Sequence, residues 1–204
     1  MCIGKPDASI GLVRFRRGPP EVSLQWHGGR STMINFPSTD RDVEEALRFL
    51  SKNMPDAERL EKPTLLHSVR VGVYLYNHGY ERSIVLAGLL HDLIEDSTVT
   101  AKEIANDFGN DVADLVKANT KNENLPKENR YEELLQRCVQ DGEQASIVKA
   151  ADIIDNLITY RKINSEEGIN NMLQFGTILL KLKPKDYTDK IFEELDSVMN
   201  KTTI

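Results

Sequence analysis

The segment His91-Asp92-Leu93-Ile94-Glu95-Asp96 places four ionisable side chains directly after an apolar stretch, Leu86–Leu90. An apolar stretch of this kind is typical of a buried helix. Ionisable groups without partners are not tolerated in a protein core, because leaving them unsatisfied costs on the order of several kcal/mol. The chain must therefore fold so that something neutralises these groups, and we expect a divalent metal ion in that role.

Helical periodicity runs through the chain from residue 40 onward and sets the expected fold class. The first helical segment has one apolar face, formed by Val43, Ala46, Leu47 and Leu50. Thr100 and Glu103 have the arrangement of a capping box at a helix start. Further helices are predicted over Thr64–Asn77, Glu81–Glu95, Thr100–Phe108, Asp111–Asn119, Tyr131–Gln140, Gln144–Lys162, Gly168–Leu182 and Tyr187–Met199. Over 40–204 no stretch alternates as a strand would, so we predict an all-α helical bundle.

Residues 1–37 differ from the rest of the chain. They contain Gly18-Pro19-Pro20 and the single tryptophan, Trp26, and they show no helical period. We expect them to form an irregular or hairpin-like extension ahead of one domain that covers residues 38–204. Met33 lies shortly before the first expected helix, which raises the hypothesis that it is the native or an alternative start.

The composition argues against several classes of partner. The chain has 204 residues, 40% of them hydrophobic, and a formal net charge of −6, which disfavours a broad surface for nucleic acid or anionic membranes. No apolar run is long enough to span a bilayer, and the N-terminus lacks a secretory signal. The two cysteines, Cys2 and Cys138, lie far apart, which favours a reducing cytoplasm. We expect neither nucleic acid nor membrane as a partner, and self-association into a homo-oligomer stays open.

Other apolar helices carry isolated polar residues that can complete a metal site. His67 lies on the second expected helix, and Asp152 interrupts the apolar segment Val148–Ala151. With His91 and Asp92 they form a set of two imidazoles and two carboxylates, which suits Mn, Fe, Zn or Mg. Glu95 and Asp96 follow Asp92 by about one helical turn, so we expect them to supply acid and base groups beside a metal-activated water.

These motifs resemble the HD-domain superfamily of metal-dependent phosphohydrolases, whose signature is the order His67, His91-Asp92, Asp152. The finer similarity is to the hydrolase domain of RelA/SpoT homologues, and it covers about residues 42–182. The segments that carry it are Pro63 with His67, Gly88–Asp96, Phe108-Gly109, Val112–Val116, Thr120-Lys121 and Val148–Leu157. The resemblance implies an all-α HD fold in a small stand-alone form, similar to the short SpoT homologues.

The resemblance also implies an activity and roles for individual residues. The reaction would be hydrolysis of the 3′-pyrophosphate of (p)ppGpp to GDP or GTP and pyrophosphate. Mn would be held by His67, His91, Asp92 and Asp152, and the acid/base work would fall to Glu95 and Asp96. Substrate contacts would come from Asn156 and Thr159, one and two turns beyond Asp152, with Arg59 in place of one family base-binding residue. Lys149 lies one turn before Asp152, so it can face the same pocket.

The chain departs from the family pattern where the base would bind. Glu58 stands where a basic residue is expected, and Ile153 replaces the usual arginine after the last metal aspartate. Two alternatives therefore stay open: an HD phosphohydrolase for another phosphorylated nucleotide, such as a nucleoside monophosphate or NADPH, and a non-catalytic nucleotide sensor. We expect Lys121, Lys127 and Arg130 to lie in a solvated loop.

Overall fold

The structure is a computed structural model that describes residues 38–56 and 63–201. The predictions for the N-terminal extension, Met33 and Arg59 lie outside these residues. Within them the chain is all-α and contains no strand, as expected. The described helices are α1 Ser38–Asn53, α2 Thr64–Asn77, α3 Arg82–Leu90, α4 Leu93–Asp96, α5 Ala101–Phe108, α6 Asn110–Ala118, α7 Lys127–Gln140, α8 Glu143–Lys162, α9 Glu166–Leu182 and α10 Lys190–Asn200.

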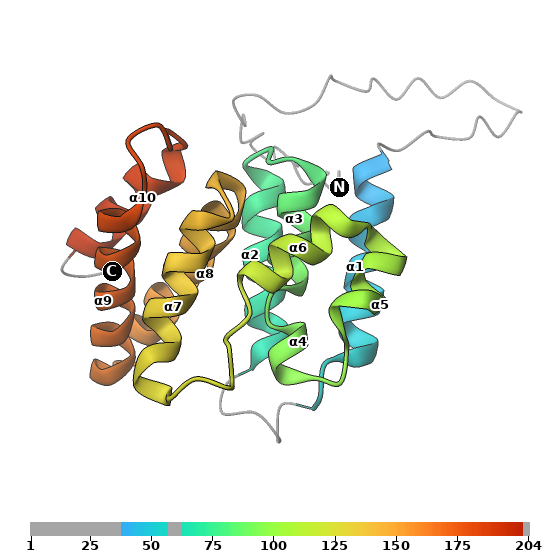
Figure 1. The fold of residues 1–204 in the computed structure, drawn as a ribbon, viewed down its shortest axis with the longest axis horizontal. Coiled ribbons are helices and arrows are strands. Elements are labelled where there is room, and N and C mark those ends of the chain that lie inside the picture. The colour runs from blue at the N-terminus through green and yellow to red at the C-terminus, as the bar shows by residue number, and fades with distance from the viewer. Residues whose placement is uncertain (1–37, 57–62, 202–204) are drawn as a thin grey trace, which may run out of the picture. The chain divides into compact units, whose positions relative to one another are not determined.

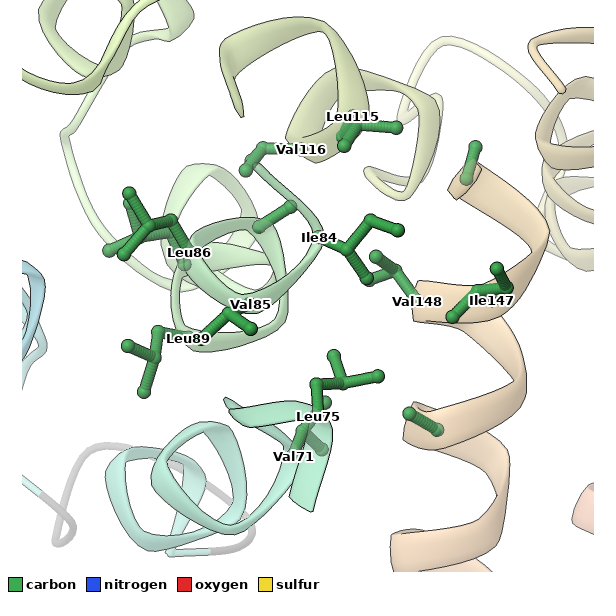
Figure 2. Close-up of a cluster of buried hydrophobic side chains, with 14 of the residues drawn as sticks. Val71, Leu75, Ile84, Val85, Leu86, Leu89, Leu115, Val116, Ile147 and Val148 are labelled. Carbon is green, nitrogen blue, oxygen red and sulfur yellow. The ribbon is translucent and has the colours of Figure 1, made fainter. Parts of the chain in front are cut away.

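Helix α3 forms the centre of the bundle, because every residue from Ile84 to Leu90 is buried. It packs against α1, α2, α6 and α8, while α9 packs against α7 and α8 (Figure 1). Figure 2 shows the resulting core, in which apolar side chains of α2, α3, α6 and α8 meet. Among the described residues, no helix is both long and apolar enough to cross a membrane.

Two glycines allow α2 and α3 to approach each other closely. A Cβ atom added to Gly72 would lie 2.3 Å from Leu89 Cγ, and one added to Gly88 would lie 2.4 Å from Leu75 Cδ1. Both distances are well inside ordinary van der Waals contact, which begins at about 3.5 Å. The two glycines therefore bring α2, which carries His67, close to α3, which leads directly into His91 and Asp92.

The structure corrects three predicted helix boundaries. The single helix expected over Glu81–Glu95 is interrupted at His91 and Asp92, which form a turn between α3 and α4. Helix α7 begins at Lys127 rather than Tyr131, directly after Pro126, whose fixed φ suits a helix start. Helix α10 begins at Lys190 rather than Tyr187, because Asp189 caps it by accepting a hydrogen bond from the backbone of Ile191. The capping box of Thr100 and Glu103 is present as predicted.

A candidate metal centre and the cavity beside it

The four predicted metal ligands come from three parts of the bundle; ligand atoms of His67, His91 and Asp152 lie within 4.8 Å of one another, and Asp92 lies beside them. His67 lies in the first turn of α2, His91 and Asp92 form the turn after α3, and Asp152 lies on α8. The Nε2 atoms of the two histidines are 3.2 Å apart, and Asp152 Oδ1 is 3.0 Å from His67 Nε2. Asp92 completes the group, with Oδ1 at 3.3 Å from His91 Nε2 and Oδ2 at 3.7 Å from His67 Nε2.

Each histidine makes a hydrogen bond at Nδ1, its outer nitrogen. This bond determines how Nε2, the inner nitrogen, faces the other predicted ligands. His91 Nδ1 lies 2.9 Å from the carbonyl oxygen of Gly88, which can only accept, so this nitrogen carries the proton. His67 Nδ1 lies 2.7 Å from Asp155 Oδ2 and donates to that carboxylate. When the rings are neutral, both Nε2 lone pairs therefore point into the space shared with Asp152 and Asp92.

This donor set fits a divalent cation. Ligands about 2.1 Å from one ion lie about 3.0 Å apart along an octahedral edge and about 3.4 Å apart in a tetrahedron. The distances between Nε2 of His67, Nε2 of His91 and Oδ1 of Asp152 range from 3.0 to 3.6 Å. Without an ion, two imidazole lone pairs would face each other across 3.2 Å, which is unfavourable. The residues present thus match a metal centre with nitrogen and oxygen ligands.

Two residues that the sequence did not single out support His67 from behind. Asp155 accepts from His67 Nδ1 and from Arg70, whose Nε and Nη2 lie 2.7 Å from Oδ1 and Oδ2 of Asp155. Burial opposes the charge of Asp155, but the hydrogen bonds from His67 and Arg70 outweigh it and hold its pKa below its usual range. The sequence places each of these residues about one helical turn after a predicted ligand: Asp155 follows Asp152 by three residues, and Arg70 follows His67 by three.

Lys149 and Asn156 flank Asp152 on α8. Lys149 Nζ lies 2.9 Å from Asp152 Oδ2, and Asn156 Nδ2 donates to Asp152 Oδ1 at 2.5 Å. Burial opposes the charge of Lys149, yet attraction to Asp152 outweighs it and raises the lysine pKa. Burial likewise opposes the charge of Asp152, but attraction to the ammonium group of Lys149 outweighs it and holds the pKa of Asp152 well below the usual range. Asp152 is therefore ionised and oriented at the centre of the site.

Glu95 is held by Lys121, which lies just beyond the end of α6. The backbone nitrogen of Lys121 lies 2.6 Å from Glu95 Oε1, and its Nζ lies 2.6 Å from Glu95 Oε2. Lys121 Nζ also lies 5.3 Å from the centre of the Tyr131 ring, within the range of a cation–π contact. The expectation of a solvated Lys121 is therefore wrong, because this side chain fixes one of the predicted acid/base residues.

A cavity of about 70 Å³, which opens to solvent, adjoins the cluster. Its lining includes the cluster's acids and both lysines, together with aromatic and apolar residues of α7, α8 and α9: Tyr131, Tyr160, Met172 and Phe175. Asn156 lines the cavity, whereas Asp96 and Thr159 are not among the residues that line it. The hydroxyl of Thr159 instead accepts a hydrogen bond from Arg70 at 3.0 Å.

Comparisons with known proteins agree with this geometry. A family model described as "HD domain" matches residues 46–175. Guanosine-3′,5′-bis(diphosphate) 3′-pyrophosphohydrolase MESH1 of Xenopus tropicalis is 27% identical over 148 residues, which are 68% of this chain and 83% of that relative. Guanosine-3′,5′-bis(diphosphate) 3′-pyrophosphohydrolase of Aquifex aeolicus is also 27% identical over 68% of this chain, but the match spans a fifth (20%) of the relative's length.

Solved structures show the same fold. A structure titled as a metazoan ortholog of SpoT that hydrolyses ppGpp superposes with a TM-score of 0.65 at 21% identity, and covers 81% of this chain and 96% of that one. A protein of Listeria monocytogenes superposes with a TM-score of 0.56 at 25% identity, over 65% of this chain and 96% of that one. At 21% identity, the similarity to the metazoan structure concerns the fold alone.

Proposed function

The chain belongs to the HD domain family, and from that premise we propose that it is a metal-dependent phosphohydrolase that removes the 3′-pyrophosphate of (p)ppGpp. The products would be GDP or GTP and pyrophosphate. Relatives from Xenopus and Aquifex are named for this reaction, and each matches 68% of the chain. The observation that carries the proposal is the convergence of His67, His91 and Asp152 beside a cavity that is lined by Asp92 and two lysines.

We assign the metal to His67, His91, Asp92 and Asp152, and we propose Mn as the ion. A divalent cation held there would polarise phosphoryl oxygens and lower the pKa of a bound water. Asp152 contributes a carboxylate that stays ionised, because the charge of Lys149 keeps its pKa low. Lys149 thus keeps one carboxylate of the ligand set in the ionised form that binds a cation.

We assign the proton transfers to Glu95 and Asp96, which lie on α4 directly after the ligands. Glu95 lines the cavity, and its contacts with Lys121 hold its carboxylate in one orientation. This orientation matters because a general base has to lie within hydrogen-bond reach of the proton that it takes. Asp96 is the candidate for the second, proton-donating role.

We propose that Lys149, Asn156, Thr159 and Arg59 bind the substrate. Lys149 and Asn156 line the cavity and carry hydrogen-bond donors that suit phosphate or ribose oxygens. The aromatic side chains in the same lining offer apolar surface for a nucleobase. We further propose a cytoplasmic location, since the described cysteine, Cys138, is a buried thiol.

The direct test is to incubate the purified chain with Mn²⁺ and a panel of ppGpp, NADPH and nucleoside monophosphates, and to measure released pyrophosphate and phosphate. We expect pyrophosphate from ppGpp, and a loss of at least about 100-fold in Asp152→Asn, which removes one ligand charge. Asp114→Asn is the matched control, because Asp114 is an exposed aspartate on α6.

Two results would replace the proposal by one of its alternatives. Release of phosphate from NADPH or a monophosphate, without pyrophosphate from ppGpp, would indicate an HD phosphohydrolase of different specificity. Nucleotide binding without turnover in the presence of any divalent metal would indicate a sensor.

A further inference from the structure

The histidines that face each other in the centre are supported in different ways. The outer nitrogen of His91 donates to a neutral backbone carbonyl, that of Gly88. The outer nitrogen of His67 donates to an ionised side chain, Asp155, at 2.7 Å. The two imidazoles therefore differ in the charge of the group that accepts the hydrogen bond from Nδ1.

We propose that Asp155 and Arg70 are positioning residues for His67, and that this pair sets how tightly the chain holds its metal ion. In treating His67 as a ligand we rely on the proposed function. Neither residue is among those that line the cavity. Their effect on the metal ion would pass through the imidazole of His67.

The geometry of Asp155 gives the physical reason. A carboxylate on Nδ1–H fixes the tautomer of the ring and its rotation, so that Nε2 keeps its lone pair toward Asp152. A negative partner also makes the imidazole a stronger electron donor than a neutral partner does. Removing the charge should therefore weaken the ligand even when a hydrogen bond to Nδ1 remains.

Arg70 holds the carboxylate in the orientation that His67 needs. Its Nε and Nη2 contact both oxygens of Asp155 in the two-point arrangement that planar guanidinium groups favour. Nη2 also donates to Thr159 Oγ1, so the guanidinium is fixed from a second direction. Because Asp155 is largely buried, the charge of Arg70 also offsets the cost of keeping the carboxylate ionised there.

The test measures Mn²⁺ binding to the purified full chain without substrate, by titration calorimetry and by competition with a chelator. Asp155→Asn keeps the shape and a carbonyl acceptor but removes the charge, and we expect its dissociation constant to rise about 10–100-fold. Asp155→Glu retains the charge and should bind more tightly than Asp155→Asn. Arg70→Lys keeps a cation but loses the two-point contact, and it should show a smaller rise than Asp155→Asn.

The controls separate metal binding from general stability. Asp114→Asn and Arg48→Lys change exposed residues of the same types and should leave the dissociation constant unchanged. Urea unfolding of each metal-free variant establishes that the protein titrated is folded; if Asp155→Asn does not fold, Arg70→Lys carries the test. Equal affinity in wild type and in the folded variants overturns the inference alone. Absence of Mn²⁺ binding to the wild-type chain overturns the proposed function as well, so the two failures are distinguishable.

Discussion

Replacing Gly72 by alanine tests whether the close approach of α2 and α3 keeps the metal ligands together. The new Cβ atom would lie 2.3 Å from Cγ, 2.4 Å from Cδ2 and 3.1 Å from the backbone nitrogen of Leu89. The shortest of these is more than about 1 Å inside van der Waals contact. Leu89 is fully buried, so its side chain has no free space to enter, and the helices must separate.

The expected loss of stability follows from two opposing effects. Overpacking of a core costs typically about 1–3 kcal/mol, and the contact with a backbone atom places Gly72→Ala near the upper end. Alanine regains about 1 kcal/mol over glycine within a helix. The net loss is therefore about 2 kcal/mol, which corresponds to a fall in Tm of about 4–8 °C for a chain of this size. Urea unfolding followed by circular dichroism measures it.

The same displacement should weaken metal binding, because His67 lies five residues before Gly72 on α2 while His91 directly follows α3. Separating the helices by about 1 Å widens the 3.2 Å gap between the two Nε2 atoms past the spacing of about 3.0–3.4 Å that neighbouring ligands of one ion adopt. The control is Gly79→Ala, which meets no atom within 4 Å but has a φ of +74°. Its cost of about 1–2 kcal/mol comes from backbone strain, remote from the ligands. Equal Mn²⁺ affinity in Gly72→Ala and Gly79→Ala would refute the reasoning.

Three further outcomes are expected. Thr100→Ala removes the cap of α5 and should lower the free energy of unfolding by about 1 kcal/mol in urea titrations. The hydrogen bond from Arg137 holds the pKa of Glu133 below its usual range. The stability that Glu133 contributes is therefore present above the unfolded pKa of about 4.3, and it is lost as pH falls through the lower pKa of the folded state. Glu133→Gln should flatten the curve of unfolding free energy against pH in that acidic window. Mn²⁺ at about 100 times its dissociation constant should raise the unfolding free energy of the wild type by about 2.7 kcal/mol in calorimetry, and that of Asp152→Asn by much less.

The helices could be predicted from the sequence wherever one face of each is buried, as for α2, whose bounds match the prediction. Periodicity failed at His91 and Asp92, because Leu93 and Ile94 continue the apolar pattern across the turn. It failed again at the start of α7, where the first turn is polar and exposed and only Pro126 marks the boundary. Hydrophobic pattern reports burial, so a turn inside a core and a helix end in solvent both escape it.

The candidate metal ligands could be predicted because ionisable residues interrupt apolar helices, and this pattern can be read within each segment by itself. Arg70 and Lys121 were not predicted to take part, because their partners lie on other elements far along the chain. Asp155 stood three residues from Asp152, but spacing within α8 cannot show that α2 lies opposite. Residues that support a ligand from another helix become recognisable once the helices are assembled.

The lysines that contact acids in the cavity lining also affect the net charge of the cavity. Two carboxylates that line the cavity each contact a lysine that also lines it: Asp152 contacts Lys149, and Glu95 contacts Lys121. A cavity lined by acids alone would repel a polyphosphate, and the repulsion would be strong where burial limits screening by salt. Because the two lysines offset two of the three negative charges in the lining, a divalent ion added to the ligand set would tip the local balance toward attraction of an anionic substrate. The acids can thus bind metal and move protons without excluding the phosphates on which they would act.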